Sequence, residues 1–76
     1  MSNSDIAKRL RERAGELARS GDKLYRVRAF RQAAFAVMGL EKDVSQLVST
    51  EGAKALERVP GIGKSLSETI AQIALN

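Results

Sequence analysis

The stretch RVPGIGKS, residues 58–65, decides how the chain is interpreted, because two different structures use sequences of this kind. Its last four residues, IGKS, are typical of the end of a nucleotide-binding P-loop. Its middle, PGIG, is typical of a tight turn between two helices that grips a nucleic-acid backbone. The first structure would suggest an enzyme, and the second a binding module.

The P-loop interpretation fails on two counts. A P-loop needs the pattern G-x-x-x-x-G-K-[ST] between a buried strand and a helix. Counting back from Gly63 puts the first glycine of the pattern at the position of Arg58. The residues before the turn, EGAKALERV, are helical in character, so the strand is missing as well.

The turn between helices needs three kinds of residue, and residues 60–63 supply them. Pro60 ends the preceding helix, because proline disfavours the helical conformation in the residue before it. Gly61 and Gly63 permit backbone angles that other residues avoid, and they leave no side chain over their N–H groups. Ile62 is expected to turn inward and fill the space between the two helices, where a polar residue would be costly.

The two residues after the turn add a preference for anions. Lys64 and Ser65 open the next helix, where the helix dipole and unpaired N–H groups favour phosphate. The sequence therefore predicts a seat for a backbone phosphate, formed by Gly61, Ile62, Gly63, Lys64 and Ser65. The alternative is an ordinary connection between helices, in which the glycines serve geometry alone.

Apolar periodicity predicts a helix after the turn and a long helix well before it. Leu66, Ile70 and Ile73 fall on one face of the last helix. The long helix is expected over Leu24–Met38, and Gly39 closes it because glycine readily takes the conformation that ends helices.

The remaining segments are also predicted to be helical. The first helix is expected over residues 5–19, with Ser4 as its N-cap. Residues 44–48 should form a short helical turn, and Thr50 should cap a brief helix that ends before Pro60. No segment alternates as a strand does. The expected fold is a compact all-α domain of four main helices, of the helix-hairpin-helix or SAM-like type, with the helix-hairpin-helix at its C-terminal end.

Length and composition narrow the function further. A chain of 76 residues is expected to form one domain, residues 1–76, with a thin core. It has no cysteine and no histidine, which excludes disulfides, thiolate nucleophiles and the usual zinc ligands. No apolar run approaches the roughly 20 residues of a membrane span, so we expect a soluble cytoplasmic protein with no membrane partner.

Positive charge is concentrated in the first half of the chain. The formal net charge is +4 at pH 7, and the helix Leu24–Met38 contributes three arginines to it. Arg26 lies at the edge of the apolar stripe of that helix, whereas Arg28 and Arg31 lie roughly opposite it. All three are candidate DNA contacts, because such a surface favours polyanions. A solvated basic face is the plain alternative.

The chain resembles a known domain along nearly its whole length. LYRVRAFRQAAFAV, followed later by ALERVPGIGKSLSETIAQI, is similar to the N-terminal helix-hairpin-helix domain of family-X DNA polymerases, the lyase-type domain of the polymerase beta kind. The resemblance implies a domain that binds gapped DNA near its 5′-phosphate during base excision repair. It also implies, as a partner, the rest of a polymerase chain, so that a full-length parent could be a DNA-directed DNA polymerase.

Transferred by position, the resemblance implies particular contacts. The N–H groups of Gly61, Gly63 and Lys64 would touch DNA phosphates, and Arg26 would contact the 5′-phosphate. Ser65 stands where the family has a lysine of the phosphate pocket, which removes one cation from it.

The resemblance also implies a bound cation and one altered contact. Main-chain carbonyls of Glu57, Val59 and Ile62 would hold a structural monovalent cation, Na⁺ or K⁺. Phe30 stands where the family has a tyrosine, so a hydroxyl contact is missing.

The departure at Thr69 concerns catalysis. At that position the family has the lysine that forms a Schiff base with the sugar aldehyde when 5′-deoxyribose phosphate is removed. Threonine has no amine lone pair for this step. We therefore assign no catalytic residue and expect DNA binding without lyase activity. A lyase that uses Lys64 or Lys23 is the enzymatic alternative.

Two alternative functions, protein interaction and polymerase activity, are less consistent with the sequence. A small helical module for protein interaction would need an exposed apolar patch, whereas the periodicity places most apolar residues toward the core. Polymerase activity cannot reside here, because Asp5, Asp22 and Asp43 are spread over helical segments rather than gathered on a sheet. The leading hypothesis is DNA binding through backbone phosphates, without sequence specificity.

Overall fold

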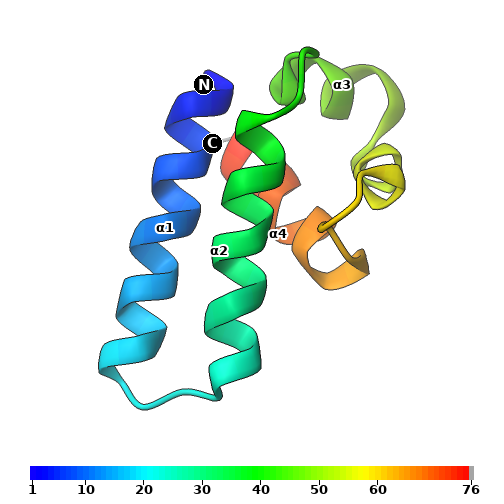
Figure 1. Ribbon diagram of the computed structural model, residues 1–76. Coiled ribbons are helices and arrows are strands. Elements are labelled where there is room, and N and C mark those ends of the chain that lie inside the picture. Colours follow the sequence, from blue (N-terminus) through cyan, green and yellow to red (C-terminus); the bar gives the residue numbers. More distant parts are fainter. Residues whose placement is uncertain (76) are drawn as a thin grey trace.

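The computed structural model describes residues 1–75, which form helices joined by short turns, with no strand among them. α1 (Asn3–Arg19) and α2 (Leu24–Met38) lie side by side in opposite directions (Figure 1). α3 (Val44–Glu51), the short 3₁₀ helix η1 (Ala53–Arg58) and α4 (Lys64–Leu75) follow along the chain. The predicted all-α fold is confirmed.

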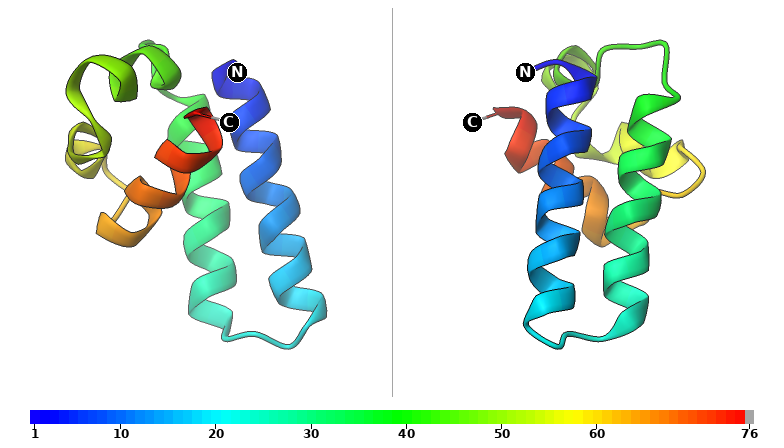
Figure 2. Two further views of the ribbon diagram at one scale, coloured as in Figure 1. Left: turned by 180° about the vertical axis from the view of Figure 1, so that it is seen from behind. Right: turned by 60° about the vertical axis from the view of Figure 1, so that its left-hand side comes forward.

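The three short helices gather around one end of the α1–α2 pair. Figures 1 and 2 show the opposite end of the pair, where the chain turns from α1 into α2, projecting beyond the other helices. The described part of the chain is therefore elongated, with principal extents of 36 × 20 × 20 Å. The last turn of α4 lies near the start of α1 in every view (Figure 2).

α1 begins two residues earlier than the sequence predicted. The Ser2 hydroxyl accepts a hydrogen bond from the Asp5 N–H at 3.1 Å, and the Asp5 carboxylate accepts one from the Ser2 N–H at 3.2 Å. This reciprocal pair is a capping box, and it makes Ser2 rather than Ser4 the N-cap. The hydrogen bond from the Ser2 backbone also lowers the pKa of Asp5 below its usual value of 3.8.

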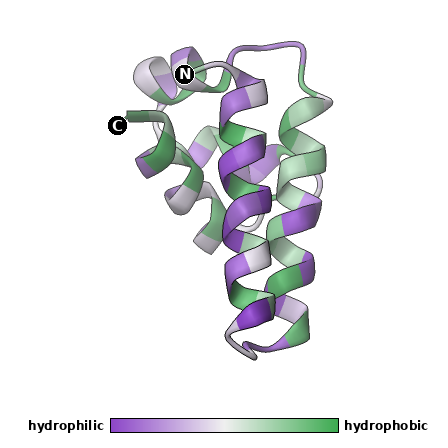
Figure 3. Ribbon diagram, turned by 90° about the vertical axis from the view of Figure 1, so that its left-hand side faces the viewer, coloured by the Kyte–Doolittle hydropathy of each residue, from purple (hydrophilic) through white to green (hydrophobic). Residues whose placement is uncertain are grey.

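α2 has the predicted bounds. Gly39 is its C-cap, and its N–H donates to carbonyls in the last turn of the helix. One side of α2 is buried against α1 and α4, while its C-terminal half also carries apolar residues on the exposed side (Figure 3). The buried residues of α2 are Val27, Phe30, Ala33, Ala34 and Val37.

The sequence correctly predicted two helical segments in the middle of the chain, but the extent of the first and the capping role of Thr50 were wrong. Residues 44–48 are the start of a full α-helix, α3, and Thr50 lies inside it, where its hydroxyl donates to the Gln46 carbonyl at 3.0 Å. The N-cap of α3 is Asp43, whose carboxylate accepts from the Ser45 N–H at 2.9 Å. Gly52, with a φ of 84°, then separates α3 from η1. The brief helix before the turn is therefore a 3₁₀ helix preceded by glycine.

Asn3 ties the start of α1 to the start of α3. Its side-chain amide donates to the Lys42 carbonyl at 2.8 Å, and its side-chain oxygen accepts from the Val44 N–H at 2.9 Å. The Ser45 hydroxyl adds a bond to the Met1 carbonyl at 2.8 Å. These bonds join segments about 40 residues apart and fix α3 beside α1.

The core lies where the short helices meet the α1–α2 pair. Ile6, Leu10, Leu56 and Ile70 are fully buried there and come from α1, η1 and α4. Ser67 is the buried polar residue of the described chain, and its hydroxyl donates to the Lys64 carbonyl at 2.7 Å. No helix among the described residues is long and apolar enough to cross a membrane.

Candidate nucleic-acid interface

The turn between η1 and α4 is fixed by one glycine and one hydrogen bond. Gly61 has a φ of 93°, a conformation that residues with a side chain rarely adopt. The Ile62 N–H donates to the Val59 carbonyl at 3.1 Å and closes the turn. Gly63 does not have a positive φ, so only Gly61 needs the conformational freedom that the sequence suggested for both glycines.

The turn rests on α2. A Cβ atom built at Gly61 would lie 3.5 Å from the Cβ of Ala36 and 3.6 Å from the Cγ of Gln32. Ile62 is buried in the hydrophobic core, with 4% of its surface exposed. The predicted inward orientation of Ile62 is confirmed, and it anchors the turn in the core.

The start of α4 carries unpaired donors. The N–H groups of Gly63, Lys64 and Ser65 donate to no acceptor within the described part of the chain, whereas the Ser67 N–H donates to the Gly63 carbonyl at 2.8 Å. A Cβ atom built at Gly63 would have nothing within 4 Å, so the backbone just before these donors is not covered by other atoms on that side. Such a helix start attracts anions through its dipole and its free N–H groups.

One groove, here called the hairpin groove, runs between α2 and the turn. It brings together six of the eight candidate DNA contacts, namely Arg26, Gly61, Ile62, Gly63, Lys64 and Ser65. Its other lining residues are Tyr25, Ala29, Phe30, Gln32, Leu66 and Thr69. The groove therefore places a cation from α2 opposite the free donors at the start of α4.

Arg26 does not enter the groove as a free cation. Its guanidinium Nη1 lies 3.0 Å from the Asp22 carboxylate, one turn earlier. The Arg26 side chain is 49% exposed and the Asp22 side chain 24% exposed, so the pair is close to solvent. Ion pairs at the surface contribute only about 0–1 kcal/mol. A phosphate can therefore compete with Asp22 for Arg26.

The other two arginines lie outside the hairpin groove. Arg31 is five positions after Arg26, which places it ~140° further around the helix. It lines a different hollow, together with Arg11 of α1. Arg28 is exposed and, among the described residues, lines neither hollow. The prediction treated the three arginines as one group because of their charge, but they point to different sides of α2 and do not form one site.

Sequence reasoning missed Tyr25 and Gln32 as lining residues of the hairpin groove. The Tyr25 side chain is 65% exposed, and the Lys23 ammonium lies 5.8 Å from the centre of its ring. Helical spacing held a signal for Gln32, which is three positions after the groove residue Ala29 and seven after Tyr25. That spacing identifies a side of α2, and only the packing of the turn against Ala36 shows which side forms the groove.

Two features bear on chemistry in the groove. Lys64 supplies the one primary amine among its lining residues, and Thr69 lines the groove with its hydroxyl donating to the Ser65 carbonyl at 3.2 Å. No group of three acidic residues able to hold a metal ion occurs among the described residues. The groove offers hydrogen-bond donors and positive charge.

The comparisons with known proteins agree with this geometry. The family model of the helix-hairpin-helix domain matches residues 1–75. The chain therefore belongs to the helix-hairpin-helix domain family, whose members generally bind DNA without sequence specificity. Comparison with curated proteins and with solved structures gives no significant match.

Proposed function

We propose that this protein binds gapped DNA through its backbone, with the recessed 5′-phosphate in the hairpin groove. The proposal rests on one observation: a single groove contains two cationic side chains and three free backbone N–H groups. The side chains are those of Arg26 and Lys64, and the N–H groups are those of Gly63, Lys64 and Ser65. A terminal phosphate carries more negative charge than an internal one and projects from the duplex end. It is therefore the part of DNA that best fits a site made of donors and cations.

The groove residues have separate roles in this proposal. The N–H groups at the start of α4 donate to phosphate oxygens, and the Lys64 ammonium supplies a mobile charge beside them. Arg26 closes the site from the α2 side and exchanges Asp22 for the phosphate. None of these groups reads a base edge, so binding is independent of sequence.

The resemblance to family-X polymerases supports two finer parts of the proposal. The first is a role in base excision repair, as the DNA-binding part of such a polymerase or as a separate cytoplasmic relative. The second is a Na⁺ or K⁺ ion on the carbonyls of Glu57, Val59 and Ile62. The Val59 carbonyl accepts the Ile62 N–H and keeps a second lone pair, so this carbonyl fits such a role.

The proposal does not include lyase chemistry. Within the groove a Schiff base would have to form on Lys64, because Thr69 has no amine; Lys23, the other candidate, does not line the groove. Borohydride reduction in the presence of a 5′-deoxyribose phosphate substrate tests this point. A covalent adduct that disappears in Lys64→Arg or in Lys23→Arg would establish the enzymatic alternative.

Titration of a labelled duplex with a single-nucleotide gap, followed by fluorescence anisotropy, tests the function. The same duplex without the 5′-phosphate is the matched control, and each titration is repeated at several salt concentrations. We expect salt-sensitive binding that is tighter with the phosphate. Equal binding to both duplexes would reduce the function to general DNA binding, and no binding at low salt would refute it.

A further inference from the structure

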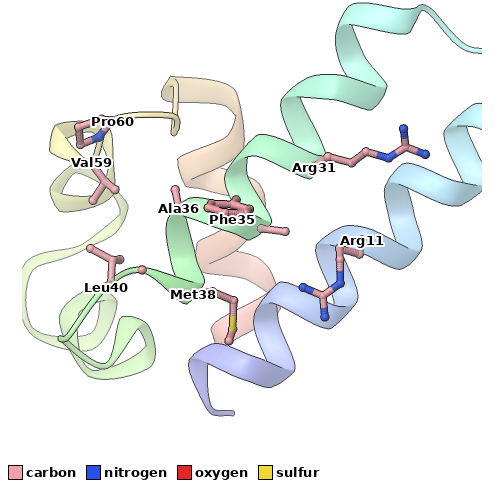
Figure 4. A pocket seen from close by; sticks show the side chains of 10 residues that line it. Arg11, Arg31, Phe35, Ala36, Met38, Leu40, Val59 and Pro60 are labelled. Carbon is pink, nitrogen blue, oxygen red and sulfur yellow. The ribbon is translucent and has the colours of Figure 1, made fainter.

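The strongest feature that the proposed function does not use is an aromatic side chain on the outside of α2. Phe35 is 84% exposed, and Met38, one turn later, is 52% exposed. Figure 4 shows Phe35 between the turn residues Val59 and Pro60 on one side and the side chains of Arg31 and Arg11 on the other. We call the surface formed by Phe35, Met38, Arg31, Arg11 and Pro60 the Phe35 face.

The Phe35 face carries positive charge and no acidic group. Neither of the two hollows that Phe35 lines includes an aspartate or glutamate. Arg31 and Arg11 are its charged residues, and neither forms an ion pair with another described residue. This sets them apart from Arg26, which is paired with Asp22. The face is therefore suited to an occupant that combines an apolar surface with negative charge.

The Phe35 face adjoins the hairpin groove. Gln32 and Gly61 line that groove and also the hollow that contains Phe35 and Arg31. A molecule held at the start of α4 can thus extend over Gly61 and Gln32 onto Phe35 without crossing a barrier of acidic side chains. Continuity with the groove favours a single occupant for both surfaces.

We propose that the Phe35 face binds an unpaired base of the strand opposite the recessed 5′-phosphate. The base stacks on the Phe35 ring, while Arg31 and Arg11 contact the phosphates of the same single strand. Stacking on an aromatic ring with cations along the backbone is how single strands are bound without sequence preference. The inference rests on the proposed function and adds a preference for DNA with an unpaired segment beside the held end.

The test compares two duplexes that share a 5′-phosphorylated end. In one the end is blunt, and in the other the complementary strand continues as a 3′ single-stranded extension with a fluorescent adenine analogue at its first unpaired position. We expect the native protein to bind the extended duplex more tightly and to quench the analogue. Phe35→Ala should remove the quenching and weaken binding of the extended duplex roughly 5- to 150-fold, with the blunt duplex bound as before.

Three variants sharpen the result. Phe35→Tyr keeps a stacking ring and should retain the quenching, whereas Phe35→Leu keeps apolar bulk and should lose it. Leu75→Ala removes another exposed apolar side chain, 66% exposed at the end of α4, and should change neither duplex. Arg31→Gln should weaken binding of the extended duplex and lower its salt dependence. The melting temperature of each variant serves as the control for the fold, and we expect it to stay close to that of the native protein.

Several outcomes would overturn the inference. If Phe35→Ala weakens both duplexes equally, Phe35 acts on the fold or on the groove. If it changes neither, while phosphate-dependent binding persists, the Phe35 face does not bind DNA although the proposed function stands. If the native protein binds neither duplex, the function and the inference fail together. Self-association that Phe35→Ala abolishes, with DNA binding unchanged, would assign the face to a second copy of the chain.

Discussion

Alanine substitution at the two glycines of the turn should have different effects: Gly61→Ala should lower the stability of the fold, and Gly63→Ala should weaken DNA binding. Gly61 has a φ of 93°, and its added Cβ would make ordinary contacts of 3.5 Å or more with α2. The cost of Gly61→Ala is therefore backbone strain without a clash, about 1–2 kcal/mol for a left-handed residue with a side chain. For a domain of this size such a loss lowers the melting temperature by roughly 4–16 °C.

Gly63→Ala is the matched partner of this substitution. Gly63 lacks a positive φ, and its added Cβ would meet nothing within 4 Å. A small loss of helix capping offsets the entropy that alanine removes from the unfolded chain, so stability should stay within about 0.5 kcal/mol. The new methyl group, however, is added at the first of the three residues with free N–H groups, where an approaching phosphate would meet it. We therefore expect weaker binding of 5′-phosphorylated gapped DNA with no loss of stability.

Two measurements decide the matter. Unfolding followed by circular dichroism gives the stability of each variant, and anisotropy at a temperature where both are folded gives the affinity. Equal destabilisation by both substitutions would refute the assignment of the strained position to Gly61 alone. Unchanged affinity in Gly63→Ala would show that no phosphate approaches the start of α4.

The remaining predictions concern the Arg26–Asp22 ion pair, Lys64, and the capping box of Ser2 and Asp5. Lys64→Ala and Arg26→Ala should each lower DNA affinity and reduce the slope of its logarithm against that of salt concentration by roughly one, and unchanged slopes would remove both from the interface. Asp22→Asn keeps an acceptor for the Lys23 N–H but frees Arg26, so titration should show tighter phosphate-dependent binding; weaker binding would mean that Asp22 positions Arg26 productively. The pKa of Asp5 is lower in the folded chain than its usual 3.8, so its carboxylate stabilises the fold above that pH, and this contribution is lost as the pH falls through the lowered value. Acid unfolding curves of the native chain and of Asp5→Ala should therefore converge at low pH, and parallel curves would contradict the capping role.

Local signals predicted α2 well because its pattern and its end agree. Apolar residues recur at helical spacing up to Met38, and Gly39 stops the helix. At the start of α1, two serines compete, and the one three residues before Asp5 forms the capping box, which the choice of Ser4 overlooked. Around α3, the weight given to Thr50 hid the stronger capping signal of Asp43. In each case the rule was correct and the choice between neighbouring candidates was wrong.

The candidate site, too, could be predicted from the sequence only in part. Residues 60–65 are contiguous, so their sequence identifies the turn and the start of α4 together. The groove, in contrast, depends on which side of α2 the turn packs against. Periodicity alone cannot tell that Arg26 lies beside the turn while Arg31 and Phe35 lie on another surface, because that depends on the position of Gly61 against Ala36 and Gln32.

The contact between Gly61 and α2 limits how small a fragment of the chain can carry the turn into another protein. The turn and its two flanking segments look like a self-contained unit of sequence, residues 53–75. One wall that supports the turn, however, belongs to Gln32 and Ala36, in a helix that ends well before this unit begins. A peptide or a graft that carries the unit alone would lack the surface against which the turn acquires its shape. A portable version must therefore include α2, and α1, which packs along it, is its natural support.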